Sequence, residues 1–151
     1  MTEGETTRLV AWSRETRRVH ERLRAALRVT RASADEQAAR ELLVFCRAFC
    51  TALTGHHEGE DHVLFPALEA AHPELRDTLR QLAHDHSVIG HLLGDLQATL
   101  DRAASPAELD RHLEGIAAIM ESHFRFEERR LLTVLETLDL DAEIDTVFGP
   151  L

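Results

Sequence analysis

The chain has 151 residues, of which 17 are Lys or Arg, 27 are Asp or Glu and 10 are His, so its formal net charge is −10 with histidine neutral. This length predicts one domain, residues 1–151, and the 44% apolar content is typical of a globular protein. The negative charge argues against a role built on phosphate contacts with nucleic acid, and no apolar run is long enough for a membrane span. The polar stretch at residues 1–9 lacks the apolar core of a signal peptide, so we expect a cytoplasmic protein.

Apolar residues recur at helical spacing in four long segments, at about residues 6–31, 34–70, 73–101 and 106–138. No stretch alternates as a strand bounded by hairpin turns does. The sequence therefore predicts an all-α protein, an up-down-up-down four-helix bundle with short connections. The tail after residue 138 contains Ile144, Val147 and Phe148, which predict a short C-terminal extension that docks as an extra turn.

The predicted helix starts carry recognisable signals. Ser33 followed by Glu36 reads as a capping box at the start of the second helix, and Ser105 caps the fourth in the same way. Pro73 and Pro106 stand where a first helical residue tolerates the missing N–H.

The second predicted helix contains Gly55, Gly59 and Pro66, which weaken or kink a helix. A tolerated irregularity in a long helix explains them. Alternatively, the small residues and the bend make room for a group beside His56 and Glu60.

Cys46 and Cys50 stand four residues apart on this same predicted helix. That spacing does not suit a disulfide without distorting the helix. We therefore expect two reduced thiols that flank the core, as is usual for a cytoplasmic protein.

Six ionisable residues occupy positions where the helical stripes would otherwise be apolar. In the third segment, His86 continues a series of leucines at alternating steps of three and four residues, and the second and fourth segments each place a His and a Glu four residues apart. Burial of such groups is costly unless they are paired or bound to a cation. The six candidate metal ligands are His20, His56, Glu60, His86, His123 and Glu127.

These residues fall at similar heights along the predicted bundle. His56 and His86 lie about 15 residues before and after the turn near Ala71, and a constant rise per residue makes these distances equal. His86 and His123 likewise lie at similar distances before and after the turn near Ala104. His20 fits less well, because it is nearer to the first predicted turn than His56 is. The first loop must then be extended, or the second helix must begin late or bend.

Four imidazoles and two carboxylates at one height favour metal ions that accept nitrogen and oxygen ligands. Six protein ligands exceed the four of a tetrahedral zinc ion. They match two iron or manganese ions with three ligands each, which leaves positions for water, an oxo or hydroxo bridge, or an oxidant. Glu60 and Glu127 come from different helices and are the natural bridging carboxylates. The Glu-x-x-His pattern of ferritin-like sites occurs only at Glu69 and His72, at a helix end.

The other histidines divide into one ambiguous residue and five peripheral ones. His57 stands beside His56 and is a candidate extra ligand or proton carrier, with a solvent-edge position as the equal alternative. Asp61 follows His57 at the spacing of the His56/Glu60 pair but lies further toward the flank, and it is a second candidate for an extra ligand or for a residue that supports the ligands. The surface or helix-end histidines are His62, His72, His84, His91 and His112.

The order of the candidate ligands, a His, then His-x-x-x-Glu, then a His, then His-x-x-x-Glu, resembles the hemerythrin-like, or HHE cation-binding, family. The resemblance extends over about residues 9–138, and its matching segments are HHEGEDHVLFPAL (56–68), LAHDHSVIGHLLGDL (82–96) and SHFRFEERRLL (122–132). The Leu-Phe-Pro after the first motif selects His56 and Glu60 over His57 and Asp61, in agreement with the stripe. The resemblance implies that the six candidates are the ligands of a non-heme di-iron site.

The chain departs from the oxygen-carrying hemerythrins, which use five histidines and two carboxylates. Their second histidine on the third helix lies four residues after the first, where this chain has Gly90. The next residue, His91, falls near the face of the predicted helix opposite to His86 and points away from the other candidates. A site poorer in histidine favours turnover of O2, peroxide or NO over reversible oxygen carriage.

We therefore expect a di-iron protein that binds or reacts with a small oxidant, with peroxide decomposition or O2 sensing as the leading forms. An enzymatic activity would then be catalase-like or oxidase-type. The alternative from the binding class is an iron or oxygen sensor, or an iron-binding protein without turnover, whose fold depends on metal. A di-iron oxygenase acting on an organic substrate is a third interpretation, which requires a pocket that reaches the metals. A metal-free bundle is disfavoured, because six ionisable groups at one level destabilise an apolar core.

Overall fold

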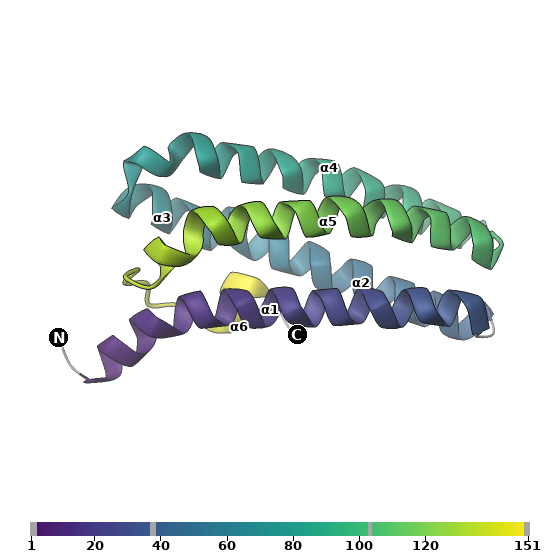
Figure 1. Ribbon diagram of the computed structural model, residues 1–151, viewed down its shortest axis with the longest axis horizontal. Helices are drawn as coiled ribbons and strands as arrows, with labels where there is room; N and C mark the ends of the chain where they lie inside the picture. Colours follow the sequence, from purple (N-terminus) through teal and green to yellow (C-terminus); the bar gives the residue numbers. More distant parts are fainter. Residues whose placement is uncertain (1–2, 37–38, 103, 150–151) are drawn as a thin grey trace.

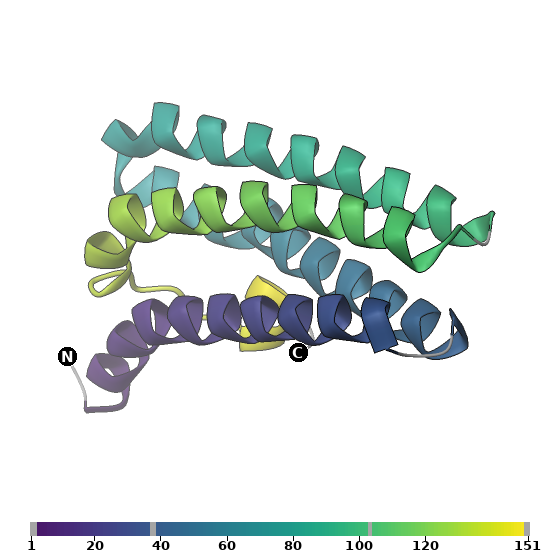
Figure 2. The same ribbon diagram turned by 45° about the vertical axis from the view of Figure 1, so that its right-hand side comes forward.

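The computed structural model describes residues 3–36, 39–102 and 104–149, and all regular structure within these ranges is helical. Four long helical stretches lie lengthwise beside one another (Figure 1, Figure 2). They are α1 (Glu3–Glu36); α2 (Ala39–Gly59) continued by η1 (Glu60–Leu64) and α3 (Phe65–Ala71); η2 (Pro73–Leu75) with α4 (Arg76–Asp101); and α5 (Pro106–Leu135). A short helix, α6 (Ile144–Phe148), follows. The prediction of an all-α bundle is confirmed.

The apolar stripes of the long helices meet in a common core. α1 packs along α5 and α2, and α4 packs along α5. Each stretch contributes fully buried leucines, among them Leu23, Leu53, Leu82 and Leu131. Burying a side chain of this size contributes about 1.5–3 kcal/mol, so this core holds the helices in register. No helix in the described ranges is both long and apolar enough to cross a bilayer.

The first connection lies further along the chain than the sequence predicted. α1 continues to Glu36 and α2 begins at Ala39, so Ser33 lies inside the last turns of α1 and does not cap a new helix. The segment contains no Pro or Gly, and its Ala, Arg and Glu residues are good helix formers, which explains why α1 continues. His20 now lies about 16 residues before the end of α1, and His56 about 17 after the start of α2. The late start of the second helix therefore removes the mismatch in height.

The second predicted helix is interrupted near the candidate ligands. α2 passes into the π-helical η1 at Glu60, and α3 then places Pro66 at its second position. A π-helical turn changes the backbone hydrogen-bond pairing, which accommodates the missing N–H of a proline in the next turn. The disturbance predicted at Pro66 therefore lies mainly in the turn before it.

The starts of the two later helices differ from each other. Ser105 caps α5 by accepting a hydrogen bond from the backbone N–H of Glu108 at 3.2 Å, and Pro106 is the first helical residue, as predicted. Pro73 begins the 3₁₀ turn η2 instead, so α4 starts at Arg76, three residues later than predicted.

The residues after α5 return to the bundle, and α6 (yellow in Figure 1) lies against α2 and η1. Val147 and Phe148 are fully buried, so the extension docks as predicted. A Cβ atom at Gly59 would collide with the carbonyl oxygen of Val147, and Gly149, with a φ of 81°, lies against the backbone of Gly55. The glycines of α2 therefore make room for the C-terminal segment. This segment itself lies beside a candidate ligand, because Phe148 packs on the ring of His56. The alternative made from the sequence, room for a group beside His56 and Glu60, therefore applies to α6.

Cys46 and Cys50 are buried free thiols on α2. Burial raises the pKa of Cys46 to about 11 and that of Cys50 to about 12. Both side chains therefore stay protonated at neutral pH and act as small core residues.

Candidate metal centre

The six predicted ligands and His57 gather in the interior of the bundle, and none of these side chains is more than 6% exposed. They form two groups of four that share Glu60, and within each group one nitrogen or oxygen atom per residue lies within 4.8 Å of the others. Group A consists of His57, Glu60, His86 and His123. Group B consists of His20, His56, Glu60 and Glu127.

Group A brings three imidazoles to Glu60. His86 Nε2 lies 3.0 Å from His123 Nε2 and 3.5 Å from Glu60 Oε1. The ring of His57 lies parallel to that of His86, with centroids 3.8 Å apart and an angle of 10° between the planes. The sequence left His57 between a ligand and a solvent-edge residue, and its 5% exposure excludes the solvent edge.

Group B pairs each of two imidazoles with a carboxylate. His20 Nε2 lies 2.8 Å from Glu127 Oε2, and His56 Nε2 lies 3.1 Å from Glu60 Oε1. Neither contact has the alignment of a hydrogen bond, although the atoms are close enough for one. The nitrogen and oxygen atoms of these two pairs therefore lie close together without forming hydrogen bonds.

Eight buried nitrogen and oxygen atoms of these two groups have no hydrogen-bond partner among the described residues. They are His20 Nε2, both ring nitrogens of His56, His57 Nε2, and both carboxylate oxygens of Glu60 and of Glu127. A buried polar atom left without a partner costs about 1–3 kcal/mol. A cation held between the groups would remove this cost, and imidazole with carboxylate is the donor set of iron, manganese and zinc sites. The residues present therefore fit a metal centre.

Three further carboxylates hold histidine rings of the two groups from outside. Each accepts a hydrogen bond from an Nδ1–H, which leaves the lone pair of that ring on Nε2, inside the site. The pairs are Asp61 with His86 at 2.8 Å, Asp85 with His123 at 3.2 Å, and Glu128 with His20 at 3.0 Å.

Of these three carboxylates, Asp61 was predicted from the sequence to lie near the ligands, whereas Asp85 and Glu128 were not. A signal was present, because each of the three carboxylates stands next in sequence to one of the six ligands. Each reaches a histidine of a neighbouring helix and not its own neighbour in the chain. The pairing could not be assigned until the helices were placed side by side.

His56 lacks such a carboxylate. Among the described residues its Nδ1 has no partner, and its ring instead packs against Phe148 of α6, with centroids 5.6 Å apart and 25° between the planes. Phe124 approaches it edge-on at 6.1 Å. The C-terminal extension therefore forms part of the apolar cover over group B.

Burial and the neighbouring charges shift the pKa values of the cluster in opposite directions. Burial, followed by nearby imidazoles, lowers the pKa of His56 and of His57 well below 6.5. Burial and Glu127 raise the pKa of Glu60 well above 4.5. Burial would lower the pKa of His20, but the carboxylates of Glu127 and Glu128 together outweigh it and raise this pKa. His56 and His57 are thus neutral at pH 7, the state in which imidazole binds metal.

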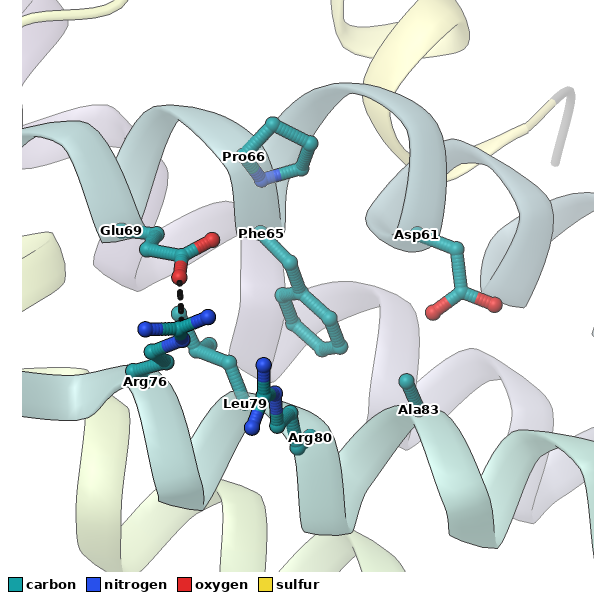
Figure 3. A pocket seen from close by; sticks show the side chains of 8 residues that line it. All are labelled: Asp61, Phe65, Pro66, Glu69, Arg76, Leu79, Arg80 and Ala83. Carbon is teal, nitrogen blue, oxygen red and sulfur yellow. Dashed lines mark ion pairs between the residues drawn. The ribbon is translucent and has the colours of Figure 1, made fainter.

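A surface pocket of about 330 Å³ between η1, α3 and α4 approaches group A. Figure 3 shows Asp61 and Phe65 in its lining, with the ion pair of Arg76 and Glu69, 3.5 Å, at one edge. Phe65 stacks on the ring of His86 at 5.5 Å, and Asp61 is hydrogen-bonded to the same ring. These two side chains therefore separate the pocket from the candidate metal centre.

The remaining histidines lie outside both groups. Three are exposed: His62, His84 and His91. His72 contacts Glu74 beside η2, and His112 contacts the hydroxyl of Thr99. These positions agree with the prediction that the five histidines lie at the surface or at helix ends.

A family model described as the hemerythrin HHE cation binding domain matches residues 13–135 of the chain. No curated protein and no solved structure shows a significant match. The matched range covers more than half of the chain and contains every residue of groups A and B. The chain therefore belongs to the hemerythrin HHE cation-binding family.

Proposed function

We propose that this protein is a non-heme di-iron protein that binds or reacts with a small oxidant, namely O2, H2O2 or NO, with peroxide decomposition as the leading reaction. The observation that carries the proposal is the pair of buried ligand groups that share Glu60. Two adjacent groups with one common carboxylate suit two ions, and their nitrogen and oxygen donors suit iron, with manganese as the other candidate.

In this proposal, His57, His86 and His123 hold one ion, and His20, His56 and Glu127 hold the other. Glu60 belongs to both groups and would contribute a carboxylate oxygen to each ion. The ions, when bound, supply the redox chemistry. The chain itself orients the rings through the hydrogen bonds of Asp61, Asp85 and Glu128, and its apolar cover excludes bulk water.

The burial of the cluster supports a small reactant over an organic substrate. Phe65 covers His86 on the side of the pocket in Figure 3, and Phe148 covers His56 on the side of α6. A diatomic molecule or peroxide can pass between side chains that fluctuate, whereas a larger substrate would have to displace one of these rings. The oxygenase alternative therefore has less support.

We also propose the setting in which this site works. The topology is an up-down-up-down four-helix bundle, which is supported by the short connections between consecutive long stretches. The protein acts in the cytoplasm, which is supported by two cysteines that remain free thiols.

A second candidate function, an iron or oxygen sensor without turnover, is favoured by the eight unpartnered atoms of the cluster. Because these unpartnered atoms destabilise the folded protein when no metal is bound, metal binding and folding are coupled. Gain or loss of iron would then change the stability of the protein, which is what a sensor requires.

Anaerobic reconstitution with Fe(II), followed by separate additions of O2, H2O2 and NO, tests the proposal. We expect two irons per chain, a change in the visible spectrum with at least one addition, and release of O2 from peroxide. A spectral change without O2 release favours the sensor. Reconstituted iron that responds to none of the three reagents would overturn the proposal. The variant His91→Ala, altered at an exposed histidine, should respond as the unaltered protein does.

A further inference from the structure

Arg24 of α1 lies just outside group B and joins α1 to α5. Its Nη2 donates to Glu128 Oε2 at 2.9 Å, its Nε donates to Glu121 Oε2 at 2.8 Å, and its Nη1 donates to Glu21 at 2.7 Å. The side chain is only 14% exposed. The planar guanidinium therefore binds three carboxylates at once in a largely buried position, which its fork of donors allows.

One of these carboxylates connects Arg24 to a ligand. Glu128 accepts a hydrogen bond from His20 Nδ1 at 3.0 Å through the same Oε2 atom that Arg24 holds. The opposite ring nitrogen, His20 Nε2, lies 2.8 Å from Glu127 inside group B. The chain of contacts thus runs from Arg24 through Glu128 to the ring nitrogen that faces the site.

A second contact reaches the same ring. The guanidinium carbon of Arg24 lies 5.4 Å from the ring centroid of Phe124, which is within cation–π range. Phe124 in turn stacks on His20, with centroids 3.9 Å apart and planes within 5°. Arg24 therefore acts on both the Nδ1 edge and the face of His20.

The other two orienting carboxylates have no such anchor among the described residues. Asp61 and Asp85 hold His86 and His123, and Asp85 also accepts from Gln81 at 3.0 Å, but no described arginine binds either. Both are short side chains, whereas Glu128 has one more rotatable bond to restrain. The longer carboxylate is the one that carries the arginine.

We propose that Arg24 is a positioning residue for the metal centre: it fixes Glu128 and Phe124 so that His20 directs Nε2 into group B. This inference rests on the proposed metal-binding function. It assigns to Arg24 a role that the cation-binding motif does not include, because Arg24 itself contacts neither group A nor group B.

The chain offers a matched control in Arg31, one of the other arginines of α1. Arg31 Nε binds Asp110 of α5 at 3.2 Å, so it also links these two helices, but no histidine lies in its contacts. Arg24→Met and Arg31→Met each remove one arginine link between α1 and α5. Arg24→Lys keeps the charge but cannot hold Glu121 and Glu128 together.

The test compares these variants in two measurements. In the first, iron affinity is measured by competition with a chelator, and the fold is checked by circular dichroism. We expect Arg24→Met to weaken iron binding by about 10–100-fold, Arg24→Lys to lie between it and the unaltered protein, and Arg31→Met to change it less than about threefold. Equal affinity in Arg24→Met and Arg31→Met would overturn the inference while leaving the proposed function intact.

In the second measurement, ¹⁵N chemical shifts report the tautomer of the neutral His20 ring in the metal-free protein, at a pH above the raised pKa of His20. We expect Nδ1 protonation in the unaltered protein and in Arg31→Met, and a mixture of tautomers in Arg24→Met. An unchanged ring in Arg24→Met overturns the inference even if the protein binds no iron. Should Arg24→Met fail to fold, Arg24→Lys decides: normal iron affinity together with a normal His20 tautomer in that variant would overturn the inference.

Discussion

His57 lies flat against His86, with the two ring centroids 3.8 Å apart. The oxygen-carrying hemerythrins, from which this chain departs, place a second histidine on the third helix, where this chain has Gly90. Gly90 faces solvent, with nothing near the position a Cβ would occupy, while His57 enters the cluster from α2. The cluster thus contains five imidazoles and two carboxylates, with one imidazole contributed by a different helix. The expectation of a cluster poorer in histidine than the site of the oxygen-carrying hemerythrins is therefore wrong.

His57→Ala should therefore remove one of the two metal ions, because it takes one of three imidazoles from group A and none from group B. His62→Ala is the matched control, since His62 lies five residues later and is exposed. Metal analysis of the two purified variants checks this. A full metal complement in His57→Ala would show that this residue is a packing neighbour of His86 and not a ligand.

Glu60→Gln should shift stability and metal content in opposite directions. Burial and Glu127 raise the pKa of Glu60 well above 4.5, so near neutral pH the unfolded state gains from ionising this carboxyl and the folded, metal-free state does not. The substitution removes that difference and should stabilise the metal-free protein, while metal content falls. Denaturant unfolding in the presence of a chelator, together with metal analysis, measures both. Loss of stability in the metal-free variant would contradict this account.

The metal-free protein should lose stability as the pH falls through about 6.5. His56, His57 and His123 all have lowered pKa values, because burial penalises the imidazolium form. Unfolding lets these three residues take up protons, whereas the raised pKa values of His20 and Glu60 act in the opposite direction. With three groups against two, the unfolded state binds more protons below about pH 6.5. Unfolding free energies measured with a chelator from about pH 7 to about pH 5 should decline, and a constant or rising stability is the opposite result.

Gly59→Ala should destabilise the protein by about 1–3 kcal/mol, because the added methyl group meets the backbone of Val147 and must displace α6. Gly90→Ala, at an exposed helical position with free space, should stabilise it by up to about 1 kcal/mol. Thermal unfolding of the two variants provides the comparison. A midpoint that rises or stays constant in Gly59→Ala would show that α6 does not depend on Gly59, whatever the result for Gly90→Ala.

The helical period was enough to find six residues of the cluster, because a His or Glu within a stripe of leucines stands out against the apolar pattern. It could not settle His57. A neighbour of His56 is turned by about 100° on an ideal helix, which places it at the edge of the stripe. Its burial depends on α4 and α5, whose His86 and His123 pack against it.

The first connection and the C-terminal segment show the same limit. The residues around Ser33 carry a capping pattern but also suit a helix interior, and in the structure α1 continues through them. Gly55 and Gly59 looked like weaknesses in a helix because their partner, the segment around Val147, is about 90 residues away in the chain. Contacts between distant segments determine both features, and no local pattern encodes them.

Metal analysis of protein purified without chelators tests the central claim most directly. We predict about two iron or manganese ions per chain, a lower content in His86→Ala and in Glu127→Ala, and an unchanged content in His91→Ala. Fewer than about one ion per chain in the unaltered protein, or an equal loss in all three variants, would contradict the account.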